Sequence, residues 1–95
     1  MDLAHMGMDL RTRYEVSLYH MTKYGEDLKD WVSADGYRDA VKKAKELSKR
    51  EDITSVAVVK NIDYYYPDKP EDIWDTIVEK RWEYRNGKLT GTFNF

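Results

Sequence analysis

The chain has 95 residues, no cysteine, and 18 acidic against 16 basic side chains, which gives a net charge of −2. This length fits one domain with one modest core. The absence of cysteine excludes disulfides and thiolate metal sites. Because the charge is nearly balanced, it excludes a strong overall attraction to nucleic acid or anionic lipid. With no apolar stretch of membrane length and no signal-peptide pattern, we expect a cytoplasmic protein that does not bind membranes.

The first residues contain a short repeat. Met1-Asp2-Leu3 recurs as Met8-Asp9-Leu10, and the residues between them are typical of a cloning junction. We therefore interpret residues 1–7 as a leader left by expression cloning, and residues 8–95 as a single domain. This interpretation makes His20 the one native histidine to consider.

Two alternating segments follow. From residue 13 to 21, side chains alternate with a period of two, and Tyr14, Val16 and Leu18 share one face with His20. The alternation continues from residue 28 to 33, after a turn-forming stretch that contains Gly25. The pattern predicts a β-hairpin over residues 13–33.

The next segment has helical periodicity. Asp35 is a favourable N-cap, and the spacing predicts an amphipathic helix over residues 36–50. Its expected core-facing side chains are Tyr37, Ala40, Val41, Ala44 and Leu47.

The second half of the chain reads as three strands. An apolar run from Val56 continues into three tyrosines and predicts a central strand that ends at Tyr66. Because proline lacks a backbone donor, Pro67 and Pro70 predict a loop over residues 67–72. Residues 76–85 alternate again, and Asn86-Gly87 predicts a type I′ hairpin turn before a short strand over residues 88–93.

The predicted order is β-β-α-β-β-β, so we expect a small α+β domain in which one amphipathic helix packs on a mostly antiparallel sheet. A hairpin, a crossover helix and a second hairpin resemble the β-grasp arrangement at the level of topology alone.

The sequence offers little for catalysis. There is no cysteine nucleophile, no G-x-S-x-G turn and no glycine-rich phosphate loop. Six carboxylates lie in the segment from Asp63 to Glu79. This segment contains no glycine, so it lacks the calcium-loop pattern. A solvated acidic loop accounts for the cluster of acids. We therefore expect no enzyme, no cofactor and no metal site. An enzyme would need Asp or Glu side chains from distant segments to meet His20.

The aromatic content is high, with eight tyrosines, three tryptophans and two phenylalanines. A small core can absorb some of these rings: Trp31, Tyr37, Trp74 and Trp82. Others are harder to bury together: Tyr19, Tyr24, Tyr65, Phe93 and Phe95. Rings scattered over the surface and a binding patch explain the second group equally well.

Our leading hypothesis is a small protein-binding module, of the inhibitor or adaptor type that phages and mobile elements encode. Aromatic anchors within a charged rim would form its contact surface. If the helix covers the face that carries Val56, Tyr65 should be the exposed tyrosine. An exposed edge strand could also pair with a second copy of the chain. The predicted contact residues are Tyr64, Tyr65, Tyr66, Asp68, Glu71 and Asp72.

The alternative hypothesis is nucleic-acid binding by the predicted helix. Four cations share one face at helical spacing: Arg38, Lys42, Lys45 and Lys49. Phosphates bind such side chains, although an ordinary solvated helix face has the same composition. Salt dependence separates the two hypotheses, because phosphate binding weakens steeply with salt.

Overall fold

The computed structural model describes residues 9–95, so the predicted leader lies outside the described residues. The elements are β1 (Asp9–Thr22), β2 (Gly25–Ala34), α1 (Tyr37–Leu47), β3 (Ser55–Tyr66), β4 (Lys69–Arg85) and β5 (Lys88–Asn94). One helix packs on one five-stranded antiparallel sheet, which confirms the predicted α+β class and element order.

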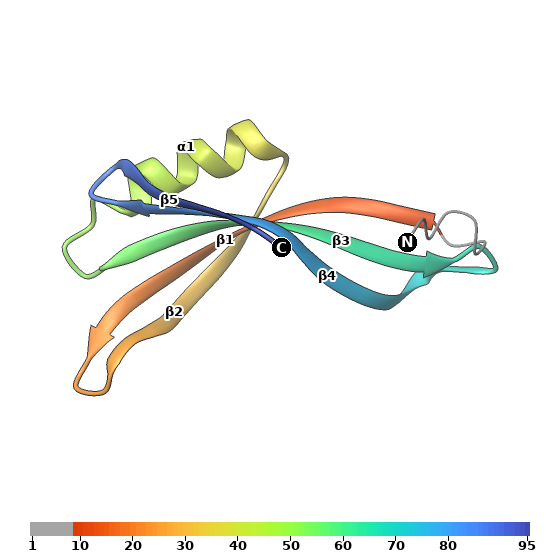
Figure 1. Cartoon of the computed structure of the whole chain (residues 1–95), viewed down its shortest axis with the longest axis horizontal. Helices are drawn as coiled ribbons and strands as arrows, with labels where there is room; N and C mark the ends of the chain where they lie inside the picture. The colour runs from red at the N-terminus through yellow and green to blue at the C-terminus, as the bar shows by residue number, and fades with distance from the viewer. Residues whose placement is uncertain (1–8) are drawn as a thin grey trace.

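The strand order in the sheet is β2-β1-β3-β4-β5, and every neighbouring pair is antiparallel. Because β2 and β3 both run antiparallel to β1, they point in the same direction, and α1 is the crossover between them. Figure 1 shows α1 on one face of the sheet, over one half of its length. The resemblance to β-grasp proteins rests on element order alone, and the all-antiparallel pairing of the strands gives it no further support.

The core lies between α1 and the sheet. Ala40 and Ala44 are one helical turn apart and fully buried, so their small side chains let the helix approach the strands closely. The aromatic rings of Tyr14, Tyr37 and Trp82 pack together beside the first turn of the helix. The buried cluster consists of Val16, Leu18, Ala40, Ala44, Ile53, Val56, Val58 and Tyr84.

The helix is shorter than predicted, and Asp35 is not its N-cap. Gly36 occupies the N-cap position, without a side-chain capping bond. Asp39 in the first turn instead fixes the residue before the N-cap, because its Oδ2 accepts a hydrogen bond of 3.0 Å from the Asp35 amide. The same carboxylate binds Lys43 at 2.7 Å, and these two contacts, with Lys43 first, lower the pKa of Asp39. An acid in the first turn also suits the positive end of the helix dipole.

The predicted turn at Asn86-Gly87 is confirmed. Both residues have positive φ, 50° and 79°, as a type I′ turn requires. β5 follows at once and pairs with the last six residues of β4, Lys80–Arg85.

The predicted loop over residues 67–72 is wrong, because β4 begins at Lys69 and runs through Pro70. Only Pro67 and Asp68 remain between β3 and β4. The strand tolerates a proline here since β5 reaches only as far as Lys80, which leaves the first part of β4 at the edge of the sheet. Pro70 also has no partner residue in β3, because the pairing skips from Lys69 to Ile73, so a missing donor is tolerated at this position.

Three strands extend beyond the helix and form what we call the arm, comprising residues 9–13, 61–66 and 69–79. Figure 1 shows β1, β3 and β4 continuing together past α1 to the far end of the molecule. The molecule is consequently elongated, with extents of 46 × 28 × 22 Å. No described residue outside the sheet covers the arm in the way that α1 covers the other half.

Candidate protein-binding site on the arm

The register of the arm separates its side chains into two faces, because directly paired residues of neighbouring strands share a face. On the helix-side face, Leu10 pairs with Tyr64, and Thr12 pairs with Ile62. On the opposite face, Arg11 pairs with Asp63, and Asp63 pairs with Thr76 of β4.

The opposite face contains a buried carboxylate. Only 2% of the Asp63 side chain is exposed. Arg13 binds it through two donors, Nε at 2.9 Å and Nη2 at 3.2 Å, and the Thr76 hydroxyl donates to Oδ1 at 2.7 Å. These bonds, led by Arg13, lower the pKa of Asp63 although burial alone would raise it. Asp63 therefore ties the three strands of the arm together and is not an available ligand.

Tyr65 lies on this opposite face as well, yet it is only 8% exposed. The prediction that Tyr65 is the exposed tyrosine is therefore wrong. The Arg11 guanidinium stands 4.5 Å from the centre of the Tyr65 ring, in cation–π geometry. Alternation placed Tyr65 on the face away from the helix, but long side chains from the neighbouring strand cover that face. Tyr64 is buried on the other face.

Tyr66 is the exposed member of the three, at 38%, and it packs against an exposed tryptophan. The rings of Tyr66 and Trp74 lie 5.6 Å apart at 68°, an edge-to-face contact. Trp74 is 53% exposed, so the expectation that a core absorbs it is wrong. The same expectation is wrong for Trp31 and for Tyr37, which is 43% exposed although its ring contacts Tyr14 and Trp82.

Ile77 of the same strand as Trp74 is exposed too, and its pairing with Ile62 places it on the helix-side face. Ile73 is also exposed, but its pairing with Tyr65 places it on the opposite face.

A register shift explains why sequence patterns missed Trp74. Tyr64 pairs with Asp75, whereas Tyr65 pairs with Ile73, so Trp74 has no partner in β3. Such a bulge re-aims side chains locally. The alternation of polar and apolar residues along β4 does not indicate that Trp74 is the extra, unpaired residue.

The predicted acidic residues lie beside the aromatic pair. Asp68 is in the turn after Tyr66, and Glu71 and Asp72 are in the first part of β4. All three side chains are exposed. Four of the six predicted contact residues are thus exposed at the end of the arm: Tyr66, Asp68, Glu71 and Asp72. The other two, Tyr64 and Tyr65, are buried. Within residues 9–95, no group of three acids or histidines has the geometry to hold a metal ion.

The four cations of the alternative hypothesis are all exposed on α1 and the turn after it: Arg38, Lys42, Lys45 and Lys49. Among the described residues, none of the four has a carboxylate within salt-bridge distance. Their neighbour Lys43 instead binds Asp39.

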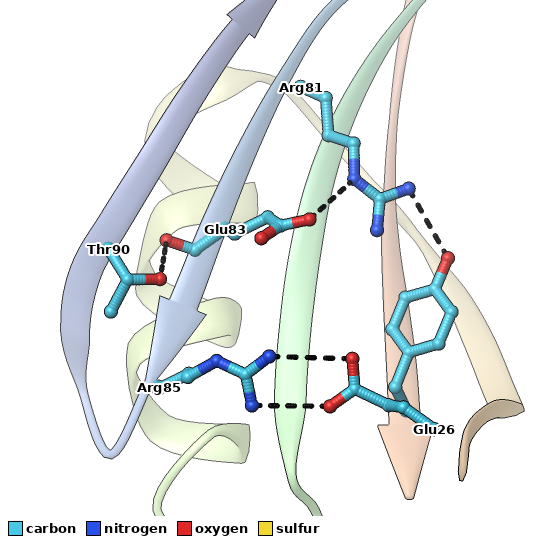
Figure 2. Close-up of polar contacts among 6 residues, drawn as sticks. Glu26, Arg81, Glu83, Arg85 and Thr90 are labelled. Carbon is cyan, nitrogen blue, oxygen red and sulfur yellow. Dashed lines mark hydrogen bonds and ion pairs between the residues drawn. The ribbon is translucent and has the colours of Figure 1, made fainter.

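The sheet face away from α1 carries a polar network that sequence patterns did not predict. Figure 2 shows it in front of the strands, with the helix behind them. Arg85 reaches Glu26 at 3.2 Å, and Arg81 binds Glu83 at 3.2 Å. Arg81 also donates to the Tyr19 hydroxyl at 3.3 Å. Because both arginines are matched by carboxylates, this face is not a basic surface.

Comparison with known protein families, with curated proteins and with solved structures found no match. Across residues 9–95, no helix has the length and apolar character needed to cross a membrane.

Proposed function

We propose that the protein is a non-catalytic protein-binding module, of the inhibitor or adaptor type, that docks through the end of its arm. The single observation that supports this most strongly is the Tyr66–Trp74 pair, which is exposed on an arm that no helix within residues 9–95 covers. We call the contact surface the arm patch. It consists of Tyr66, Asp68, Glu71, Asp72, Trp74 and Ile77.

The composition of the arm patch supports protein recognition. Tyrosine and tryptophan are the side chains most enriched at interface hot spots, and exposed rings surrounded by charges match an apolar centre with a polar rim. Exposed apolar side chains that lie together, rather than scattered singly, often mark a binding surface. A tertiary contact holds each ring against the other, which reduces the entropy lost on docking.

The experiment is affinity capture with the full chain, treated with nuclease, followed by measurement of the affinity for the captured protein. Trp74→Ala and Tyr66→Ala should each weaken binding by about 2 kcal/mol or more, which corresponds to about thirtyfold in Kd. Circular dichroism should remain unchanged, because both rings are exposed.

The matched control is Tyr24→Ala. Tyr24 is 88% exposed in the turn between β1 and β2, so it also presents a large ring to solvent, but not on the arm. Its removal should leave the Kd unchanged. If the three variants bind equally well, the arm patch is not the docking surface.

The second candidate function is nucleic-acid binding through α1. The observation that favours it is the set of four exposed cations without salt bridges. A Lys42→Glu/Lys45→Glu double variant should then abolish binding to RNA or DNA, and binding by the unaltered chain should fall steeply with salt. Capture that resists nuclease and survives this double variant excludes this second function.

A further inference from the structure

Along most of the arm, no strand of the described residues pairs with the outer side of β4. β5 pairs with β4 only from Lys80 onward, and the Phe95 amide closes the pairing with a bond of 3.0 Å to the Glu79 carbonyl. Within residues 9–95, no strand pairs with the outer side of residues 71–78. A strand at the edge of a sheet presents a row of backbone donors and acceptors that another extended chain can use.

We infer that this β4 edge, which comprises residues 71–79, receives an extended basic segment of the partner protein as an added strand. The inference builds on the proposed function, and it specifies both the mode of docking and the chemistry of the partner. Main-chain hydrogen bonds would supply the affinity in this mode, and alternate side chains of the added strand would supply the specificity.

The regular part of the edge is short and well defined. Register shifts interrupt the pairing of β3 with β4 on either side of residues 75–78, which pair without interruption with Asn61–Tyr64. This stretch contains Thr76, Ile77 and Val78, which are β-branched and suited to an extended backbone. The flanking bulges and Pro70 limit the added strand to these residues and a few neighbours, because bulges and prolines disrupt a pairing edge.

Charge identifies the chemistry of the partner. Residues 71–79 contain four acids and no basic side chain. Glu79 is matched by Lys60 at 2.7 Å, whereas Glu71, Asp72 and Asp75 have no salt bridge among the described residues. Lysine or arginine side chains on an added strand would lie close to these three carboxylates.

A second copy of this chain fits the β4 edge poorly. Its own β4 edge would bring four acids against four acids, and like charges placed opposite each other destabilise a strand pair. The other edge of the arm, residues 9–13, carries Arg11 and Arg13. Arg11 is stacked on Tyr65, and Arg13 is bound to Asp63, so both already have partners within the chain. A basic segment from another protein is the occupant that remains.

The test uses the ¹⁵N-labelled full chain and a short blocked peptide that alternates lysine with valine. We expect the peptide to slow hydrogen exchange of amides in residues 75–78 and to leave the amides of β2 and β5, the two outermost strands of the sheet, unaffected. Two comparison peptides separate strand pairing from simple charge attraction. One replaces the central valine by proline and keeps the charge, and the other replaces every lysine by glutamate. Neither should protect the β4 edge.

Charge reversal on the protein supplies the matched control. Asp72→Lys/Asp75→Lys should raise the Kd for the lysine–valine peptide by about tenfold or more at low salt. Asp27→Lys/Asp30→Lys makes the same change on β2, where both aspartates are exposed, and should have little effect.

Three results would overturn the inference: equal binding of the proline-containing peptide, protection outside residues 71–79, or concentration-dependent self-association through the edge. Each leaves the proposed function intact if Trp74→Ala still weakens binding of the captured partner by about thirtyfold. Conversely, edge protection by the peptide together with unaltered capture by the Trp74→Ala variant would support the added strand and reject the arm patch.

Discussion

The Gly87 amide donates a hydrogen bond of 2.8 Å to the Ser48 hydroxyl, which joins the turn between β4 and β5 to the end of α1. The Ser48 carbonyl accepts a second bond of 3.1 Å from the Asn86 amide. Ser48 is buried and therefore shielded from competing water. One serine thus fixes the position of the helix relative to the last hairpin, 39 residues further along the chain.

Ser48→Ala should lower the free energy of unfolding by about 1–3 kcal/mol, because it leaves the half-buried Gly87 amide without its acceptor. Urea denaturation measures this loss. Ser33→Ala serves as the control, since Ser33 is exposed in β2, and its effect should stay within about 0.5 kcal/mol. Equal effects would show that the Ser48 hydroxyl contributes nothing specific.

Gly87→Ala should destabilise the protein for two reasons that a second substitution separates. A side chain at φ 79° is strained, and the added Cβ would lie 2.5 Å from Cε of Lys49. The combined loss should be about 1–3 kcal/mol. In a Lys49→Ala background the steric part disappears, so the loss caused by Gly87→Ala should become smaller. An unchanged loss would mean that the Lys49 side chain moves aside without cost.

Ala44→Leu should lower the free energy of unfolding by about 1–3 kcal/mol, because the fully buried Ala44 leaves no room between the helix and the sheet. The neighbouring substitution Lys45→Leu places the same side chain on the exposed face of α1 and should cost no more than about 0.5 kcal/mol. Thermal unfolding of the two variants provides the comparison. Similar melting temperatures for the two variants would show that α1 does not pack tightly on the sheet at Ala44.

Arg13→Met should change how stability depends on pH. In the unaltered protein the pKa of Asp63 is lowered, so its contribution is present above the ordinary aspartate pKa of about 4 and is lost as pH falls through the lower folded value. Without Arg13 the buried carboxylate has only Thr76, and burial should raise its pKa. The penalty, about 3 kcal/mol at neutral pH, should then shrink as the pH falls and Asp63 becomes protonated.

Urea denaturation at several pH values from neutral to about 3 tests this reversal. In an Arg13→Met/Asp63→Asn variant, position 63 can no longer titrate, so the recovery at low pH should disappear. A penalty for Arg13→Met that is the same at every pH would indicate that water reaches Asp63 once the arginine is removed.

Asp68→Lys/Glu71→Lys/Asp72→Lys should act mainly on the rate of partner association. These exposed charges form the rim of the arm patch, and rim charges guide the approach of a partner more than they hold the complex together. Stopped-flow or surface-based kinetics should show slower association, with a larger effect at low salt than at high salt. A change confined to dissociation would place these acids at the centre of the contact instead.

The sequence by itself determined those elements whose signals are local. Val16 and Leu18 alternate with polar residues, so β1 could be predicted with its buried face. The spacing of Ala40 and Ala44 predicted the buried side of α1. Asn86-Gly87 predicted its turn because few other residue pairs accept two successive positive φ angles. In each case the local structure is determined by interactions among a few neighbouring residues, so the sequence pattern is enough to predict it.

Only the tertiary structure decided which side chains are exposed at the surface. Pro70 lies within β4 because β5 is too short to reach it, which makes that part of β4 an edge. Tyr65 is covered because Arg11 from another strand lies over its ring, and Trp74 is exposed because a bulge leaves it without a partner in β3. Each outcome depends on where a strand far along the chain begins, ends or slips in register. The exposure of a side chain depends on which residues surround it in space, and the residue pattern along one strand does not identify those neighbours.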